Sequence, residues 1–366
     1  MRAGSVICGS LRFSPARGIA LGFLSSLFGK KKDPAPARPA SPAALSWKVT
    51  TVTKETPSTV SFEVDATMDF KAGQFVLLRP KADMPWRAYS FSRVPGAPLR
   101  LTVKKVKDGV VSTHLTEKLA AGDVLDVKGP FGHFVLPATF KRALFIAGGS
   151  GITPFLSQLQ EQQKLGWPAP IALLDFNRTA AEQILKTELD ALVASSGGKL
   201  VITHLLDDAA SGPKGPPSKD VLGALLAGQE QPDVVAMCGP QPMMDLAREA
   251  VHARFAGVTL LEEKFTMSHD EGGSGATMTV ELVMDGKSKP FPVKDGEHVL
   301  AAARKAGLNM SAGCEMGACG VCRVKVLSGE IHIPDDACLS DGEKSEGYAL
   351  VCVGTAKSNC RIEPAP

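Results

Sequence analysis

The chain has 366 residues, and at about 100 to 200 residues per domain this length predicts two to four domains. Hydrophobic residues make up 44% of it and charged residues 22%, which excludes a disordered or fibrous protein. The 41 basic and 38 acidic residues leave a net charge of +3, so no strong field would attract nucleic acid. No apolar run reaches the ~18 residues that a membrane-spanning helix requires.

Residues 1–44 are predicted to be a flexible basic leader, because they are rich in proline and have no acidic side chain before Asp33. Within this leader, residues 18–32 place apolar side chains at helical spacing next to three consecutive lysines. That pattern is typical of an amphipathic helix in peripheral contact with a membrane. The alternatives are a disordered tail or translation that begins further downstream.

The segment 45–138 is predicted to form a small antiparallel β-barrel. Short runs rich in Val, Thr and Phe alternate there with Gly and Pro turns, as regularly spaced short strands do. The expected strands are 47–53, 59–64, 74–79, 88–92, 99–105 and 124–128. One helix is expected, over 114–121.

The pattern changes in the segment 139–265, where apolar strands alternate with helices. This alternation predicts right-handed βαβ crossovers and a parallel sheet that is buried on both faces. The expected strands are 143–147, 171–175, 200–205, 234–237 and 258–261. The expected helices are 154–165, 180–193, 219–226 and 241–255.

A Gly-rich linker, 266–276, separates these segments from a third predicted domain, 277–366. The third domain begins with a hairpin pattern over 278–284 and 290–293, and a helix is expected over 298–306.

Four cysteines of the third domain have the C-x4-C-x2-C spacing, with a distant fourth cysteine, that plant-type [2Fe–2S] clusters use. They are Cys314, Cys319, Cys322 and Cys352. A zinc site is the alternative, but it would more usually have two C-x2-C pairs or histidine partners. Cys338 and Cys360 lie outside the spacing and are interpreted as ordinary thiols.

The run GGSGITP at 148–154 directly follows a predicted strand and begins a helix. Its glycines allow a pyrophosphate to approach, and Thr153 is expected to cap the helix, so that amide groups and the helix dipole face the anion. The alternative is a tight strand-to-helix turn without a ligand, since the run is not the G-x-G-x-x-G fingerprint.

Three further stretches give this run a context. In RAYS at 87–90, an arginine can pair with a phosphate and a tyrosine can lie along an aromatic ring. DGVVST at 108–113 begins the helix of the barrel and offers a second anion site. MCGP at 237–240 ends a buried strand at the carboxyl edge of the sheet, where α/β folds bind ligands.

Taken in this order, RAYSFS, DGVVST, GGSGITP and MCGP resemble the ferredoxin–NADP⁺ reductase superfamily over residues 45–265, and the last domain resembles a plant-type ferredoxin. The whole of 45–366 is similar to phenylacetyl-CoA oxygenase reductases, hybrid-cluster-protein reductases and electron-transfer partners of acyl-CoA desaturases. The resemblance implies a multidomain protein with a flavin-binding antiparallel β-barrel, an α/β parallel-sheet nucleotide-binding domain and an α+β β-grasp ferredoxin domain. It implies FAD and a [2Fe–2S] cluster, with NAD(P)H as electron donor.

The resemblance also implies roles for individual residues. Arg87 would contact the flavin phosphates, Tyr89 would stack on the isoalloxazine ring and Ser90 would hydrogen-bond near its N5 atom. The other implied flavin contacts are Thr102, Lys104, Gly109, Ser112 and Thr113, and a GPFG turn at 129–132 favours FAD over FMN. The implied nucleotide contacts are Gly149, Gly151, Thr153, Asn177, Arg178, Cys238, Gly239 and Pro240. The expected catalytic residues are Ser90, Cys238 and Glu263.

The choice of nucleotide stays open in the sequence. Asp175 ends a parallel strand and could accept the 2′-hydroxyl of NADH, whereas Asn177 and Arg178 could bind the 2′-phosphate of NADPH.

The order of the modules predicts the direction of electron flow. A nicotinamide gives a hydride and a [2Fe–2S] cluster accepts one electron at a time, so a flavin must stand between them. We therefore expect a cytoplasmic enzyme that passes electrons from NAD(P)H through FAD and the cluster to a separate oxygenase or desaturase. The alternatives are a reductase of a soluble hybrid-cluster or other redox protein, and a relay ferredoxin whose reductase half has decayed.

Overall fold

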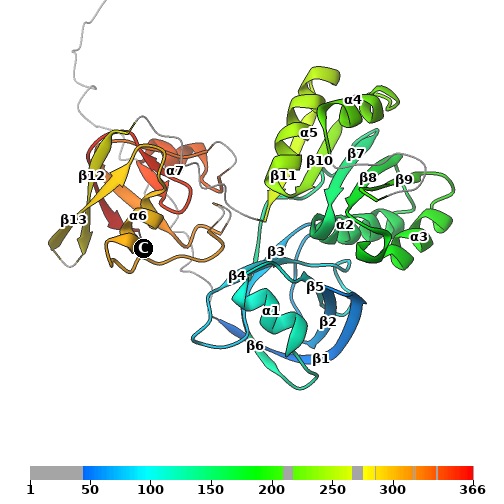
Figure 1. Ribbon diagram of the computed structural model, residues 1–366, viewed down its shortest axis with the longest axis horizontal. Coiled ribbons are helices and arrows are strands. Elements are labelled where there is room, and N and C mark those ends of the chain that lie inside the picture. The colour runs from blue at the N-terminus through cyan, green and yellow to red at the C-terminus, as the bar shows by residue number, and fades with distance from the viewer. Residues whose placement is uncertain are drawn as a thin grey trace, which may run out of the picture. The chain divides into compact units, whose positions relative to one another are not determined.

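The computed structural model describes residues 44–208, 217–265, 275–284, 286–315, 317, 319–334 and 337–365. It contains three larger sheets, which follow one another along the chain (Figure 1). The predicted amphipathic stretch 18–32 and most of the predicted linker lie outside the described residues. In the described part of the chain, no helix is both long and apolar enough to span a bilayer.

The first sheet is an antiparallel barrel in the strand order β4-β3-β6-β1-β2-β5. Its strands are β1 (Leu45–Thr56), β2 (Thr59–Asp65), β3 (Phe75–Arg79), β4 (Arg87–Ser90), β5 (Arg100–Lys104) and β6 (Val124–Phe131). A bridge between Phe91 and Leu101 joins the two outer strands and closes the barrel. Side chains such as Trp47 and Phe62 fill its interior, so the barrel predicted from short alternating strands is present.

The helix of the barrel, α1 (Val110–Glu117), begins four residues earlier than predicted. Val111 and Leu115 are both buried, and their spacing of four residues defines the buried face of the helix. The expectation of a helix over 114–121 was wrong at both ends. The amide of Ala120 is bonded to the carboxylate of Asp123, which forms a turn where the helix was expected to continue.

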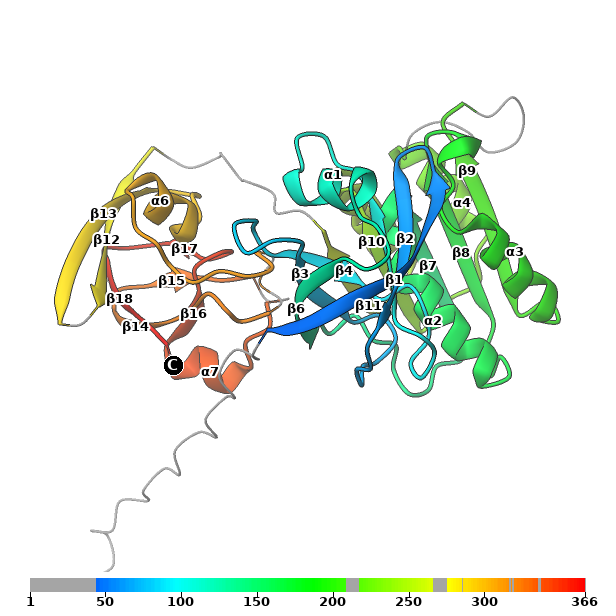
Figure 2. The ribbon, with the colours of Figure 1, turned by 90° about the horizontal axis from the view of Figure 1, so that it is seen from below.

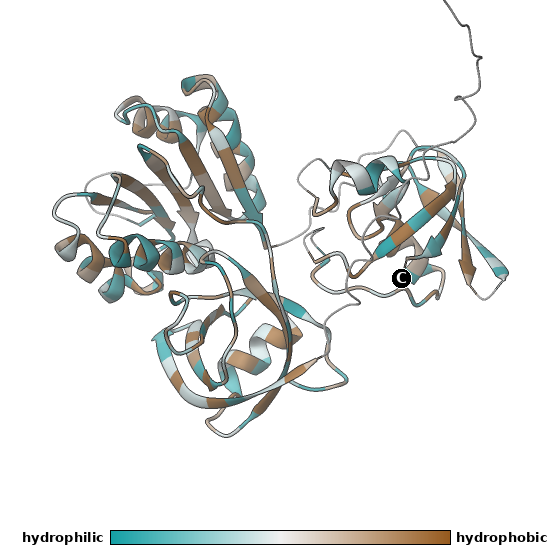
Figure 3. Ribbon diagram, turned by 180° about the vertical axis from the view of Figure 1, so that it is seen from behind, coloured by the Kyte–Doolittle hydropathy of each residue, from teal (hydrophilic) through white to brown (hydrophobic). Residues whose placement is uncertain are grey.

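The second sheet is parallel throughout, in the order β11-β10-β7-β8-β9. Its strands are β7 (Ala143–Gly148), β8 (Ile171–Asn177), β9 (Leu200–Leu206), β10 (Val234–Gly239) and β11 (Thr259–Lys264). Figure 3 shows apolar residues along the central strands, as expected for a sheet that is covered on both faces.

Two pairs of helices cover the two faces of the parallel sheet (Figures 1 and 2). They are α2 (Ile152–Lys164) and α3 (Lys186–Ser195) on one face, and α4 (Lys219–Ala227) and α5 (Gln241–Arg254) on the other. The alternation along β7 explains both layers. Ala143 and Phe145 belong to the hydrophobic core under α2 and α3, whereas Leu144 and Ile146 belong to the core under α4 and α5.

The single helix predicted over 180–193 is broken. A 3-10 turn, η2 (Ala180–Glu182), is followed by Leu185 in the left-handed region at φ 60°, and only then does α3 begin. Ile184 and Leu185 are both buried in the core. The local bend allows two consecutive apolar side chains to be buried together, which a regular surface helix would not do.

The third sheet has the order β13-β12-β18-β14-β16, in which β12 and β18 run parallel. Its strands are β12 (Thr277–Met284), β13 (Lys287–Lys294), β14 (Arg323–Ser328), β16 (Tyr348–Leu350) and β18 (Cys360–Pro364). The smaller elements are α6 (Val299–Lys305), β15 (Ile331–His332), α7 (Asp341–Ser345) and β17 (Thr355–Ala356). Leu300 and Ala303 of α6 pack with Phe291 of β13, which gives the expected β-grasp arrangement.

Candidate functional site

A cavity of about 440 Å³ lies where strands β4 and β5, the start of α1 and the carboxyl edge of the parallel sheet meet. Most residues predicted to bind flavin line it. These are Arg87, Tyr89, Ser90, Thr102, Lys104, Gly109 and Ser112. From the predicted nucleotide contacts, Thr153, Gly239 and Pro240 also line it. One cavity therefore brings together residues from all four motifs of the first two domains.

Strand β4 supplies the residues of the RAYS motif. Arg87 is exposed and donates a hydrogen bond to the backbone oxygen of Trp86 at 2.8 Å. Burial raises the pKa of the Tyr89 phenol, although Arg87 opposes this shift, so the phenol stays neutral. Ser90 is 2% exposed, and its hydroxyl has no hydrogen-bond partner among the described residues. A buried unpaired hydroxyl in a cavity wall fits a polar ligand atom at this position.

The first turn of α1 supports the second anion site. The Ser112 hydroxyl donates to the Gly109 oxygen at 3.1 Å and accepts from the Val106 amide at 3.1 Å. A Cβ atom at Gly109 would stand 2.5 Å from that hydroxyl, so only glycine fits this close approach. Thr113, which was also predicted to hold the pyrophosphate, does not line the cavity.

The glycine turn after β7 has a different internal arrangement from the predicted one. Thr153 donates to the Ser150 oxygen at 3.0 Å, and α2 begins after Gly151 with no side-chain cap. The expectation that Thr153 caps this helix was therefore wrong. Because Ile152 is already the first helical residue, Thr153 lies inside the first turn, where its hydroxyl reaches back to a carbonyl.

Gly151 is required by packing. A Cβ atom there would lie 2.0 Å from the backbone oxygen of Cys238, so the turn rests directly on the end of β10. Gly149 has φ 54°, and a Cβ atom at this position would be 3.7 Å from the Lys104 ammonium. The turn thus joins the parallel sheet to the flavin-side residue Lys104.

Cys238 and Glu263 are paired in register on β10 and β11. Neither lines the cavity, and both are buried, with 0% and 6% of their surfaces exposed. Burial, followed by the nearby Glu263 charge, raises the pKa of the Cys238 thiol. Burial, followed by the charge of Cys314, raises the pKa of Glu263 to about 8. One carboxyl oxygen of Glu263 has no partner among the described residues.

The residues considered for nucleotide choice are all hydrogen-bonded to other side chains of the protein. Asp175 is 2% exposed, and its Oδ2 accepts from Asn177 Nδ2 at 2.9 Å and contacts His204 Nδ1 at 2.9 Å. Arg178 is bonded through its guanidinium to Glu182. None of these side chains lines the cavity.

The four predicted cluster cysteines are all buried. The Cys314 amide donates to Cys319 Sγ at 3.2 Å, and Cys322 and Cys352 belong to the same hydrophobic core cluster. In the described part of the chain, no group of three or more Cys, His, Asp or Glu side chains has converged to metal-binding geometry. Four buried thiols with this spacing nevertheless form a donor set that fits a [2Fe–2S] cluster. Cys360 lies apart and donates to the Glu330 oxygen at 3.2 Å.

The cysteine loop contacts the barrel. Cys314 and Cys319 form a hydrophobic cluster with Phe75 and Leu77 of β3, with Trp86 and Ala88 partly buried against it. Cys314 also lines the cavity, a contact that sequence reasoning missed. Cys314 and Ala88 are 226 positions apart, so no local pattern could have revealed this contact. Ser150 was likewise not predicted as a lining residue, although it lies within the glycine run 148–154, and Phe265 also lines the cavity.

Comparison with known proteins gives three family matches along the chain. An oxidoreductase FAD-binding domain matches residues 46–136, an oxidoreductase NAD-binding domain matches 145–249, and a 2Fe-2S iron-sulfur cluster binding domain matches 282–357. These matches follow the order of the three sheets.

Two relatives and one solved structure extend these matches over most of the chain. The ferredoxin reductase component of 3-ketosteroid-9-alpha-monooxygenase from Mycolicibacterium smegmatis is 30% identical over 79% of this chain and 85% of its own length. The NADH oxidoreductase HCR of Escherichia coli is 29% identical over 82% of this chain and 92% of its own. The structure of phthalate dioxygenase reductase matches with a TM-score of 0.59 and 25% identity, covering 88% of this chain and 98% of that protein.

Proposed function

The chain belongs to the ferredoxin reductases of the phthalate dioxygenase reductase type, with a C-terminal [2Fe–2S] domain, and from this premise we propose that it is the reductase component of an oxygenase system. It is an oxidoreductase whose cofactors are FAD, a [2Fe–2S] cluster and NAD(P)H. The observation that carries the proposal is the composition of the cavity. Flavin-side residues, the nucleotide-side residues Gly239 and Pro240, and the cysteine Cys314 all line it.

The residues of the chain would act on bound cofactors in distinct ways. A bound flavin supplies the conversion between two-electron and one-electron transfer. Ser90, whose buried hydroxyl lacks a partner among the described residues, would donate a hydrogen bond to the flavin ring. Ser112 and Gly109 would hold the pyrophosphate at the start of α1. Cys314, Cys319, Cys322 and Cys352 would hold the cluster next to the barrel.

Other assignments rest on less direct support. Arg87 and Tyr89 line the cavity and would contact the phosphates and ring of the flavin. Cys238 would act through its backbone, which supports the glycine turn at Gly151. The domain limits 45–138, 139–265 and 277–366 stay predictions, and so does a cytoplasmic location, which fits the need for nicotinamide and for reduced cysteines.

The proposal is tested with the full chain loaded with FAD and cluster. Anaerobic stopped-flow mixing with NADH should bleach the flavin absorbance first, and the EPR signal of a reduced [2Fe–2S] cluster should grow afterwards. An oxygenase component should be identified by its binding to the chain in a pull-down experiment. The reduced chain should then transfer electrons to that oxygenase component. Flavin that no nicotinamide can reduce would contradict the proposal and would favour the relay ferredoxin. Coupling only to a soluble redox protein without oxygenase activity would favour the other alternative.

We also propose NADH as the preferred donor. Glu182 accepts from Lys104 Nζ at 3.0 Å and from Arg178 Nη2 at 2.9 Å, so its carboxylate occupies the hydrogen-bond donors of both cations at the carboxyl edge of the sheet. Burial alone would raise the pKa of Glu182, but the hydrogen bonds from Lys104 and Arg178 lower it, so the carboxylate stays charged. The residues after the second parallel strand discriminate at the ribose 2′ position. The Glu182 carboxylate would compete with the 2′-phosphate of NADPH for Arg178 and Lys104.

The variant Glu182→Gln tests this preference. It should raise the ratio of kcat/KM for NADPH to that for NADH by about tenfold, since the carboxylate no longer competes with the 2′-phosphate for two cations. Using a ratio cancels any general effect on activity. Glu249→Gln removes another ion-paired glutamate of the same domain, which is bonded to Lys219, and should leave the ratio unchanged. A wild-type enzyme that already prefers NADPH would contradict the proposal.

Membrane contact through residues 18–32 is a separate prediction. It is tested by sedimenting the full chain, and a chain without residues 1–44, with vesicles that contain anionic lipid. Binding of only the full chain supports a membrane-associated acceptor such as a desaturase, whereas equal recovery in the supernatant contradicts it.

A further inference from the structure

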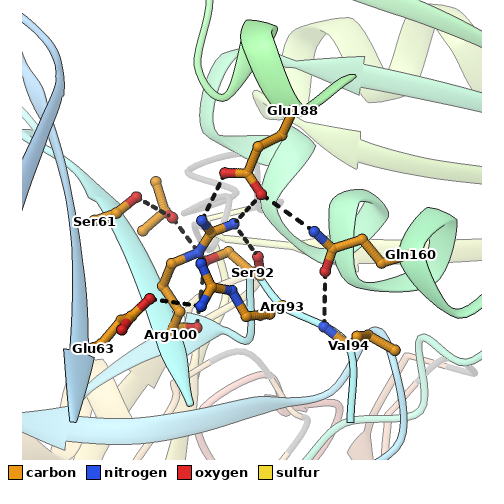
Figure 4. Close-up of polar contacts among 9 residues, drawn as sticks. Ser61, Glu63, Ser92, Arg93, Val94, Arg100, Gln160 and Glu188 are labelled. Carbon is orange, nitrogen blue, oxygen red and sulfur yellow. Dashed lines mark hydrogen bonds and ion pairs between the residues drawn. The ribbon is translucent and has the colours of Figure 1, made fainter. Parts of the chain in front are cut away.

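Arg100 of β5 makes an ion pair with Glu188 of α3, which joins the barrel to the parallel-sheet domain (Figure 4). The pair is bidentate, with Arg100 Nη1 2.6 Å from Glu188 Oε1 and Nη2 3.0 Å from Oε2. The Arg100 side chain is only 6% exposed and that of Glu188 is 35% exposed. A planar, partly desolvated pair of this kind fixes orientation as well as distance.

On the barrel side, the guanidinium of Arg100 is bonded to Ser92. Arg100 Nη2 donates to the Ser92 oxygen at 2.6 Å, and Nε donates to the Ser92 hydroxyl at 3.3 Å. That hydroxyl also accepts from Thr102 at 2.7 Å. Thr102 lines the cavity, and Ser92 stands two residues after the cavity residue Ser90. The ion pair is thus linked through Ser92 to the cavity residue Thr102.

On the other side, Glu188 is itself held in place. Its Oε2 accepts from Gln160 of α2 at 3.2 Å, and Gln160 Oε1 accepts from the Val94 amide of the barrel at 3.0 Å. Figure 4 shows Gln160 and Arg100 converging on Glu188 from two sides. Helix α2 begins directly after the glycine turn predicted to bind the nucleotide pyrophosphate. The carboxylate therefore connects the nucleotide-side turn to the flavin-side strands.

We infer that Arg100 and Glu188 are positioning residues that set the geometry between the nicotinamide and flavin rings. This inference rests on the proposed function. Hydride transfer requires the reacting atoms to be about 3 to 3.5 Å apart, and a displacement of ~1 Å can slow a reaction about a hundredfold. The two rings would be held by different domains, so a contact that fixes one domain on the other controls their distance. Neither residue lines the cavity.

The first test is Glu188→Gln in the full chain loaded with FAD and cluster. Gln keeps the length of the side chain and removes its charge. At saturating NADH the hydride-transfer rate constant in stopped-flow should fall about tenfold or more, and the charge-transfer absorbance between nicotinamide and flavin should weaken. The FAD content, the Kd for NADH and the later rate of cluster reduction should stay within about twofold of the wild type, because these do not depend on the domain contact.

Asp190→Asn is the matched control. Asp190 lies on the same helix and is ion-paired with Lys186, but this pair is exposed and within α3. Its variant should keep the wild-type hydride-transfer rate within about twofold. A variant that merely destabilises the fold would lower the unfolding temperature and FAD content without changing the rate of the flavin that remains bound.

Arg100→Lys and the double variant complete the test. Lys keeps the charge but cannot form the bidentate pair, so its hydride-transfer rate should fall as in Glu188→Gln. The double variant should be no slower than the slower single variant, since residues that act as a unit are not additive. If both single variants match the wild type, the inference is wrong although the proposed function stands. If wild-type flavin is not reduced by any nicotinamide, the proposed function itself fails.

Discussion

Ser90 is the single residue in which sequence pattern and structure agree most directly on a chemical role. Its hydroxyl is buried in the wall of the cavity and has no partner among the described residues. A hydrogen bond to the flavin would satisfy this group, which otherwise carries the cost of lost hydration. We expect Ser90→Ala to slow hydride transfer by about tenfold to a hundredfold with FAD still bound, because a preorganised donor is lost. Ser58→Ala is the control, because the Ser58 hydroxyl is also buried without a partner among the described residues but does not line the cavity. Ser92→Ala would not serve, since Ser92 accepts hydrogen bonds from Arg100. Equal rates in Ser90→Ala and wild type would contradict the role.

Glu263 gives a prediction that depends on pH. Burial raises its pKa to about 8, whereas the unfolded chain loses this proton near its ordinary value of about 4.3. The folded state therefore binds more protons than the unfolded state between these values, so stability is highest below the lower value and falls as the pH rises through the higher one. Glu263→Gln removes this dependence. Relative to wild type, the variant should gain roughly 2 to 4 kcal/mol between about pH 5 and about pH 8.

The measurement is urea unfolding of the wild type and of Glu263→Gln, monitored by circular dichroism at about pH 5 and about pH 8. Parallel loss of stability in wild type and variant would show that Glu263 does not carry the proton.

At the scale of residues, those in short motifs could be predicted from the sequence, because RAYS and the cysteine spacing are local. Arg100 and Glu188 could not, since they are 88 positions apart and neither belongs to a local pattern.

At the scale of elements, helices α2, α4, α5 and α6 lie within two residues of the predicted limits, whereas the helices predicted over 114–121 and 180–193 were wrong. Strands of the parallel sheet are short apolar runs between turns, and β7 and β9 end within one residue of the predicted limits. The helix over 180–193 failed at Leu185, because burial in the tertiary core overrode a regular helical pattern. No local signal distinguishes Ile184 and Leu185 from the buried face of a continuous helix.

The glycine turn after β7 provides a test at the same scale. Gly151→Ala would place a Cβ atom 2.0 Å from the Cys238 backbone oxygen, so either the turn or the end of β10 must move. We expect weaker NADH binding by tenfold or more and a lower unfolding temperature. Gly223→Ala is the control, because a Cβ atom there meets nothing within 4 Å and alanine favours the helix α4. Unchanged NADH binding in Gly151→Ala would contradict this close packing.

At the scale of the whole molecule, the order of cofactors predicts which acceptors can be served. Cys352→Ser should prevent assembly of the cluster, since serine replaces one of four thiolates. The variant should still pass electrons from NADH to ferricyanide, which can take them from a flavin, but its reduction of cytochrome c should fall by about a hundredfold. Cys360→Ser is the matched control, because Cys360 donates to a backbone oxygen apart from the four. Full reduction of cytochrome c by Cys352→Ser would contradict the order in which electrons pass from the flavin to the cluster and then to the acceptor.

The break at Leu185 also decides how the two catalytic halves can move. In a continuous helix, residues 182 and 188 would lie about 120° apart around the axis, and they could not both reach one strand. With the break, Glu182 binds Lys104 and Glu188 binds Arg100, at the two ends of β5. A single attachment would act as a pivot, about which one half could swing. Two attachments on one strand define an axis, and the bond between Gln160 and the Val94 amide lies away from β5, so it opposes the remaining rotation about that axis. The cavity that Thr102 lines between the two attachments is therefore held at one width.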